Sequence, residues 1–253
     1  MLYDDTLSYI GNPIDVIKKL YNEKNWNGIF TFCKEMLDSD PKDLVALQNI
    51  ATALLQVEKY DDVISYCDIV LQMNPLDEYA LKNKIFALER LKKFDQVILC
   101  CNKLLGKNQN DTWAIDSKGL ALNEMNLHEE AISNYNLSLK INPDNTTALM
   151  NKAITLSHLE RYADAIPVYD EAQSLDPTLK EAALAKSIAY TKLGKQDEAF
   201  LAAQGLLVSD ILQFKSKALE KKMRVFDYYC LHEFLEIEKR EKQHKEKLSS
   251  KSD

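Results

Sequence analysis

Glycine and proline are scarce in this sequence of 253 residues, which contains only six of each. Both residue types interrupt regular elements, so their scarcity argues against a chain made largely of turns and favours long, regular elements. Leucine, alanine, lysine and glutamate, which are good helix formers, are abundant instead. The composition therefore predicts a helical chain, long enough for one extended domain or two small ones.

Long apolar runs are also missing. No segment approaches the ~20 apolar residues that a membrane-spanning helix needs. The first ten residues, MLYDDTLSYI, contain two aspartates and no basic flank, unlike a signal peptide. Five cysteines without an export signal fit a reducing compartment, and a net charge of -7 disfavours binding to nucleic-acid phosphates. We therefore expect a cytoplasmic protein with no membrane or nucleic-acid partner.

Catalytic and metal-binding motifs are not found in the sequence. Gly106-Lys107 and Gly194-Lys195 lack the upstream glycine of a phosphate-binding loop. His232-Glu233 starts like a zinc-protease helix, but Glu236 stands where the second histidine ligand is needed. No histidine pairs with a cysteine at finger-like spacing. We expect no enzymatic activity, no metal and no cofactor.

A period of 34 residues runs through the chain. Proline recurs in one column, and aspartate or asparagine follows two positions later. Proline cannot continue a helix, and the short polar side chain can cap the next helix by accepting a bond from a free backbone N–H. The prolines are Pro41, Pro75, Pro143 and Pro177, and the predicted N-caps are Asp43, Asp77, Asp111 and Asn145.

Apolar residues repeat with the same period. Within each copy they are spaced by three, four and seven, which is typical of amphipathic helices. One column lies early in a first helix and another seven residues later, while a third lies in a second helix. These columns are Leu47, Leu81, Ile115 and Leu149; Leu54, Leu88, Leu122, Leu156 and Tyr190; and Ile29, Val63, Val97, Ala131, Ala165 and Ala199.

The pattern resembles the tetratricopeptide repeat family. The best copy reads Ile115, Lys118-Gly119, Leu122, Ala131, Tyr135 and Pro143. The next best reads Leu149, Lys152-Ala153, Leu156, Ala165, Tyr169 and Pro177. The resemblance implies an all-α fold, a right-handed superhelical solenoid of stacked antiparallel helix pairs with a C-terminal capping helix.

The predicted organisation follows from the repeat and its ends. A stack of helix pairs needs caps, because its terminal apolar faces are otherwise exposed. The capping helix should bury one face, which carries Leu219, Met223, Phe226, Cys230 and Phe234. The predicted parts are an N-terminal extension at 1–12, a degenerate first repeat at 13–43, five repeats at 44–213, the capping helix at 214–247 and a tail at 248–253.

Two further columns allow competing interpretations. Cys33, Cys67 and Cys101 could form a redox or metal ladder, but we favour small core residues, because cysteine is often buried. Lysines recur at the same position in four copies, each directly after a position of the groove predicted below. They could bind phosphate or acidic groups, or their stems could pack between repeats while the ammonium groups reach solvent. These lysines are Lys84, Lys118, Lys152 and Lys186.

A binding groove is expected on the concave face. In the family that the chain resembles, the first helix of each pair lines this face. Asparagines at one column could hydrogen-bond a ligand backbone, because an amide offers both donor and acceptor. An apolar stripe lies three residues further on. The alternative is that the stripe belongs to the inter-repeat core. The candidate groove residues are Asn49, Tyr79, Asn83, Phe86, Trp113, Ser117, Leu120, Met150, Asn151, Ile154 and Ile188.

The sequence thus predicts a non-enzymatic scaffold that binds a peptide or helix of a partner protein in its concave groove. Exposed apolar grooves usually mark binding sites, and peptides or amphipathic helices fit them. Two alternatives stay open: a self-associating structural protein that forms a homo-oligomer, and a regulatory subunit of an enzyme encoded elsewhere.

Overall fold

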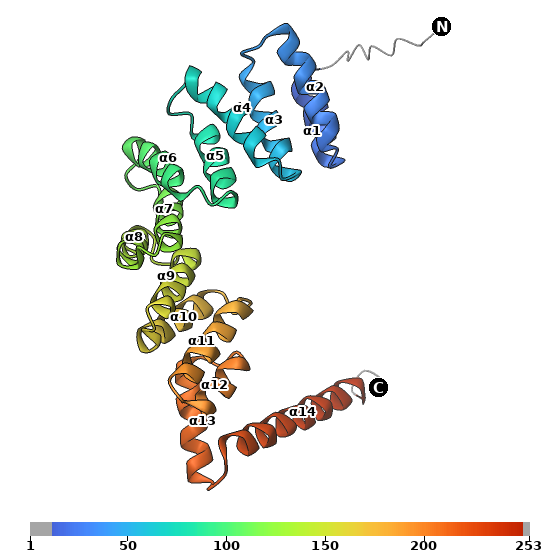
Figure 1. Cartoon of the computed structure of the whole chain (residues 1–253). Coiled ribbons are helices and arrows are strands. Elements are labelled where there is room, and N and C mark those ends of the chain that lie inside the picture. The colour runs from blue at the N-terminus through green and yellow to red at the C-terminus, as the bar shows by residue number, and fades with distance from the viewer. Residues whose placement is uncertain (1–11, 250–253) are drawn as a thin grey trace. The chain divides into compact units, whose positions relative to one another are not determined.

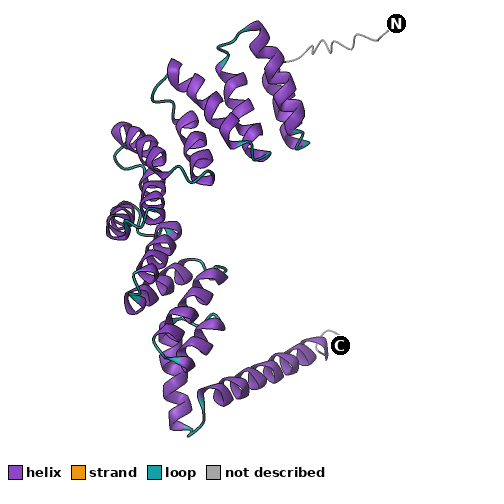
Figure 2. Cartoon of the chain, viewed as in Figure 1, coloured by secondary structure: helices purple, strands orange, loops and turns teal. Residues whose placement is uncertain are grey.

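The structure of the chain is a computed structural model that describes residues 12–249. Within that range the regular elements are all helices, and there is no strand (Figure 2). The predicted extension at 1–12 lies outside the described residues except for Asn12, as does the predicted tail beyond residue 249. The helices are α1 (Pro13–Asn22), α2 (Trp26–Ser39), α3 (Leu44–Gln56), α4 (Tyr60–Met73), α5 (Glu78–Arg90), α6 (Phe94–Lys107), α7 (Thr112–Glu124), α8 (His128–Ile141), α9 (Thr146–His158), α10 (Tyr162–Leu175), α11 (Lys180–Lys192), α12 (Gln196–Ala203), α13 (Val208–Glu220) and α14 (Val225–Ser249), labelled in Figure 1.

The chain divides into two compact units, residues 1–141 and 142–253. In the first unit each helix from α1 to α8 packs against the next, and α3 also contacts α5. In the second unit α9 to α14 pack consecutively in the same way, and α9 also contacts α11. Contact between the first helices of successive pairs is what stacked pairs require. The prediction of an all-α solenoid is confirmed.

The four predicted caps begin α3, α5, α7 and α9. The side-chain oxygens of Asp43, Asp77, Asp111 and Asn145 accept from backbone N–H groups three residues on, at 3.0, 2.8, 3.1 and 3.2 Å. Asn12 caps α1 in a related way, and Pro13 is the first helical residue, where its missing N–H removes no helical bond. Each cap satisfies a donor that the helix leaves free.

A second column, absent from the sequence-based prediction, ends the first helix of each pair. These residues have left-handed backbone with φ between 52° and 72°, and they recur every 34 residues. Five of them are not glycine, although left-handed backbone is strained for residues with a Cβ atom. They are Lys24, Glu58, Lys92, Asn126, Glu160 and, in the last copy, Gly194.

The cysteine column belongs to the core, as favoured above. Cys33, Cys67 and Cys101 are free thiols with at most 1% exposure. Burial raises the pKa of each to about 12, so each is a neutral thiol near pH 7. Thiolate is the form that attacks disulfides and binds metals, so burial suppresses both kinds of chemistry here.

The lysine column does not form a ladder of free ammonium groups. Lys84 pairs with Asp68, Lys118 donates to Asn102 Oδ1 at 2.9 Å, and Lys186 pairs with Asp170. Each acceptor lies 16 residues earlier, on the second helix of the preceding pair. The expectation that the ammonium groups reach solvent is wrong for Lys186, which is fully buried. These bonds join neighbouring helix pairs.

The predicted capping helix at 214–247 is two helices. α13 ends at Glu220, and Lys222 has left-handed backbone with φ of 53° before α14 begins at Val225. Because of this break, the residues before and after it do not lie on one face of a single helix, as the prediction assumed. Leu219 is therefore 79% exposed, and Phe226, Cys230 and Phe234 are also exposed. Packing in this region instead buries Ile211, Ala218, Val225 and Tyr228.

Candidate functional site

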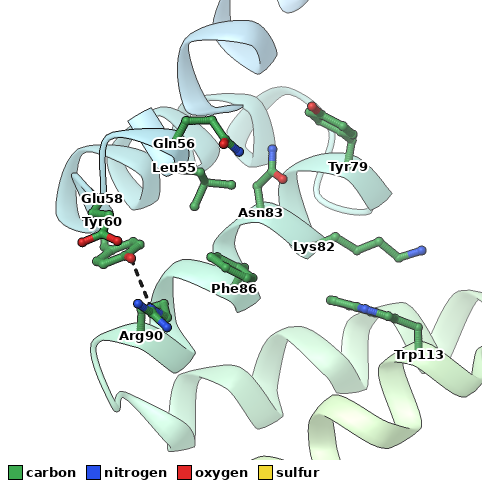
Figure 3. A pocket seen from close by; sticks show the side chains of 10 residues that line it. All are labelled: Leu55, Gln56, Glu58, Tyr60, Tyr79, Lys82, Asn83, Phe86, Arg90 and Trp113. Atoms are coloured by element: carbon green, nitrogen blue, oxygen red, sulfur yellow. Dashed lines mark hydrogen bonds between the residues drawn. The ribbon is translucent and has the colours of Figure 1, made fainter. Parts of the chain in front are cut away.

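A hollow of about 620 Å³ opens beside α5 in the first unit (Figure 3). This volume lies within the ~300–1,000 Å³ typical of ligand sites. We call it the α5 hollow. Its lining residues are Leu55, Gln56, Glu58, Tyr60, Tyr79, Lys82, Asn83, Phe86, Arg90 and Trp113.

One face of α5 supplies the centre of the hollow. Lys82, Phe86 and Arg90 are spaced by four residues, so they follow one another along the same side of the helix. A different side of α5 carries Leu81 and Ile85, which are fully buried in the core. Because that side anchors α5, its hollow-facing side chains are left exposed, and Phe86 is 46% exposed.

The α7 side of the hollow combines an aromatic ring with a compensated cation. Trp113 is 38% exposed, and Lys82 Nζ lies 5.3 Å from the centre of its ring. Lys82 also forms an ion pair with Glu78 at 2.7 Å and lies 4.0 Å from Asp111. The hydrogen bond from Lys82 lowers the pKa of Glu78. The lysine charge is therefore met by two carboxylates.

The other end of the hollow carries Arg90 and Tyr60. Arg90 Nε donates to Tyr60 Oη at 3.1 Å, and its guanidinium lies 5.8 Å from the centre of the tyrosine ring (Figure 3). Arg90 makes no ion pair with any residue in the described part of the chain. Glu58 also lines the hollow but lies beyond ion-pair distance of Arg90. The guanidinium thus has donors left over.

Two polar side chains complete the α3 side. Tyr79 and Thr52 share a hydrogen bond of 2.5 Å, in which Tyr79 donates because Thr52 Oγ1 already donates to the Gln48 carbonyl. Asn83 Nδ2 is buried and has no hydrogen-bond partner within residues 12–249. An unsatisfied buried donor is unfavourable by roughly 1–3 kcal/mol. Because no hydrogen bond holds Nδ2 in place, a half-turn of the Asn83 amide can bring this donor to an acceptor in the hollow.

Four predicted groove residues meet in this hollow: Tyr79, Asn83, Phe86 and Trp113. Sequence reasoning did not assign Leu55, Tyr60, Lys82 or Arg90 to it. The signal that could have found Lys82 and Arg90 is their spacing of four residues on either side of Phe86.

Ser117 does not belong to an open groove. It is only 9% exposed and hydrogen-bonds to Glu89. Burial raises the pKa of Glu89 to about 7, and the bond with Ser117 only partly opposes that rise. The other Glu89 oxygen, Oε1, is buried without a partner in the described residues. The helical phase of Ser117 is that of Asn83, but its side chain turns into the interface between α5 and α7.

The remaining predicted residues do not line the α5 hollow. Asn49 lines a separate hollow of about 340 Å³ beside α1, and its Nδ2 donates to the Val45 carbonyl at 2.8 Å. Leu120 is half-buried. In the second unit, Ile188 is exposed, while Met150, Asn151 and Ile154 are half-buried.

Residues 12–249 offer neither a cluster of metal ligands nor a membrane-spanning helix. Within them, no group of three or more histidine, cysteine, aspartate or glutamate side chains could hold a metal ion. None of the helices between residues 12 and 249 combines the length and apolar character that crossing a bilayer requires.

Comparison with known proteins supports the repeat assignment. The sequence profile of the family described as Tetratricopeptide repeat matches residues 115–145 and 146–179. No curated protein sequence matches the chain significantly. Many solved structures share the fold, at identities that show the fold alone.

Three of these structures illustrate the likeness. A tetratricopeptide repeat protein from Parabacteroides merdae has a TM-score of 0.67 and 16% identity, with 75% of each chain covered. MamA from Desulfovibrio magneticus RS-1 has a TM-score of 0.62 and 15% identity, with 66% of this chain and 94% of MamA covered. YrrB, described as a TPR protein with an unusual peptide-binding site, has a TM-score of 0.54 and 15% identity, with coverage of 75% and 97%.

The profile match and the fold agree with the helix pairs that follow one another in each unit. Residues 115–179 thus match the tetratricopeptide-repeat family, and the chain has the fold of solved tetratricopeptide-repeat proteins.

Proposed function

We propose that this protein is a non-enzymatic interaction scaffold, and that its α5 hollow binds an apolar side chain from a segment of a partner protein. The observation that carries the proposal is the exposure of two aromatic side chains, Phe86 and Trp113, around one hollow. Large apolar side chains gathered at a concave surface are characteristic of binding sites.

The energetics favour an apolar anchor at this place. Burying one large apolar side chain contributes ~1.5–3 kcal/mol, and a few such anchors dominate most interfaces. Phe86 and Trp113 supply ring surface, while Asn83 supplies a donor that lacks a partner. A backbone carbonyl of the ligand could satisfy that donor after a half-turn of the amide, which exchanges its nitrogen and oxygen.

A random peptide library displayed on phage tests the proposal. The unaltered protein should retain a subset of clones, and Phe86→Ser should lose them. Leu99→Ser is the matched control, because Leu99 is an exposed apolar residue of the same unit that does not line the hollow. Both variants should melt near the unaltered protein, since exposed sites usually change stability by less than ~0.5 kcal/mol. Equal retention by Phe86→Ser and the unaltered protein would contradict the proposal.

A second candidate function, self-association, is favoured by the apolar surface of α13 and α14. Leu212, Leu219, Phe226 and Phe234 are all more than half exposed there. Sedimentation at several concentrations tests it. Self-association predicts a mass that rises with concentration and a smaller rise for the Leu219→Ser, Phe234→Ser double variant. A constant monomer mass in both proteins would exclude it.

A further inference from the structure

We propose that the α5 hollow selects an extended segment whose apolar anchor is followed or preceded, two residues away, by an aspartate or glutamate that pairs with Arg90. This inference rests on the proposed function, because it specifies the ligand of the same hollow. It follows from three features of the hollow: the charge of Arg90, the distance from Phe86 to Arg90, and the amide of Asn83.

The two cations of the hollow differ in how far they are compensated. Lys82 already faces the carboxylates of Glu78 and Asp111. Arg90 has only the hydroxyl and ring of Tyr60, and no carboxylate in the described chain lies within ion-pair distance of it. A guanidinium has five N–H donors in a planar fork that matches a carboxylate. Arg90 uses one of them on Tyr60.

The stacking of Arg90 against Tyr60 also prepares the guanidinium for such a partner. A ring that holds the guanidinium in place reduces the side-chain freedom lost on binding. The ring and the hydroxyl act on the same arginine, at 5.8 and 3.1 Å. A carboxylate arriving from the hollow therefore meets a fork that is already oriented.

The spacing along α5 sets the spacing in the ligand. Phe86 and Arg90 are four residues apart, which is ~6 Å along a helix. Two residues of an extended peptide span ~6.6 Å, and side chains two residues apart lie on the same face of an extended chain. An apolar residue over Phe86 and a carboxylate on Arg90 thus fit positions i and i+2 of one extended segment.

A helical ligand would place the same two side chains four residues apart, so distance alone does not decide between the two. Asn83 favours the extended form. A half-turn of its amide, which breaks no hydrogen bond of Nδ2, brings that donor to the hollow, and carbonyl groups are free along an extended backbone but used within a helix. An extended ligand therefore brings a free backbone acceptor to that amide beside the anchor, which the middle of a helix does not.

The same displayed library tests this specificity when it is selected separately on three proteins. Clones held by the unaltered protein should carry aspartate or glutamate two residues from an apolar residue. Arg90→Glu should replace that acid by lysine or arginine in the selected clones. Lys140→Glu is the matched control, because Lys140 is also a cation in the last turn of a helix, α8, but does not line the hollow. Its clones should match those of the unaltered protein.

A change on the peptide side avoids any effect on folding. Replacing the acid of the best synthetic peptide by its amide should weaken binding to the unaltered protein about tenfold or more, because a hydrogen-bonded charge pair is lost. The same replacement should have little effect on binding to Arg90→Gln.

The outcomes separate the two proposals. Retained clones with an apolar anchor but no acid at the second position would overturn the inference and leave the proposed function standing. An acid enriched four residues from the anchor would also overturn it, in favour of a helical ligand. If the unaltered protein retains no clones, or if Phe86→Ser retains the same clones, the proposed function and the inference are both overturned.

Discussion

Glu89 in the first unit is largely removed from water and Lys186 in the second is fully buried, and these two ionisable side chains are accommodated in opposite ways. In the second unit, Lys186 is fully enclosed but bonds to Asp170, to Gln173 Oε1 at 2.8 Å and to the Leu206 carbonyl at 2.8 Å. In the first unit, Glu89 has only Ser117, and its Oε1 has no partner among the described residues. The cost of burying a charge can thus be offset by hydrogen-bonded partners, or avoided by a shift in pKa that leaves the group neutral.

The short helix α12 explains why Lys186 is enclosed and Lys84, in the same column, is not. The second helices of the earlier pairs have 14 residues, whereas α12 has eight. The chain after α12 then brings the Leu206 carbonyl to Lys186 and the Val208 N–H to Asp170 Oδ1, each at 2.8 Å. Lys84, at the same place in an earlier repeat, bonds to Asp68 and stays partly exposed.

The largest expected effect comes from breaking the enclosed pair. Lys186→Met should destabilise the protein by about 3–5 kcal/mol, because it leaves Asp170 without its cation in a largely buried place. The matched change Lys84→Met should cost less than ~1 kcal/mol, because its partner Asp68 is well exposed to water. Urea unfolding of the two variants measures the difference. Similar losses would show that enclosure of the second pair has no energetic consequence.

The next effect is a pH dependence that belongs to the first unit. The pKa of Glu89 rises from its ordinary value of 4.5 to about 7 in the folded protein. Between these values the folded state holds a proton that the unfolded state has released, so the free energy of unfolding falls as pH rises through this window. The size of the fall is on the order of 2–3 kcal/mol.

Comparison with Glu89→Gln isolates this contribution. The amide does not titrate, so the stability of the variant relative to the unaltered protein should rise from about pH 5 to about pH 8. Unfolding in urea across that range gives the difference directly. A difference that is constant with pH would mean that Glu89 is ionised in the folded protein throughout, with the cost of its burial met in another way.

The sequence predicted the parts of the fold that depend on residue type. Aspartate or asparagine caps four successive copies, and apolar residues keep their helical spacing, so both columns could be recognised. The left-handed column could not be recognised, because Glu58 and Lys92 occupy a conformation usually associated with glycine. The break after Glu220 likewise has no glycine or proline to mark it.

The sequence predicted the hollow less completely than the fold. The columns indicated Asn83 and Phe86, whose exposure follows from the phase of α5. The different fates of Lys84 and Lys186 could not be predicted, because the lysine is the same and the later chain decides its surroundings. Ser117 was misplaced for the same reason, since its burial depends on Glu89 from the neighbouring helix.

A smaller effect is expected at the left-handed turn of the second unit. Gly194 has a φ of 72°, and a Cβ added there would meet no atom within 4 Å. Gly194→Ala should therefore cost ~1 kcal/mol from backbone strain alone. Gly106 in α6 has equally open space without the left-handed backbone, so Gly106→Ala should stabilise by ~0.5–1 kcal/mol. Urea unfolding should give opposite signs, and equal signs would exclude strain as the cause.

The smallest effect on stability is expected at Phe86 and at Ile188, which lies three repeats later in the same column. Both side chains are about half exposed, at 46% and 52%, so replacing either by serine should change stability by less than ~0.5 kcal/mol. Leu120→Ser should cost more, because Leu120 is half-buried and loses packing.

Peptide binding should distinguish Phe86 from Ile188, although the stability of the two variants should not. Phe86 lies in the α5 hollow with Trp113 and Arg90, whereas Ile188 does not line that hollow. Phe86→Ser should therefore abolish retention of displayed peptides, and Ile188→Ser should leave it unchanged. Equal loss from both variants would mean that peptide binding depends on the whole apolar column, since no feature particular to the α5 hollow would then be needed.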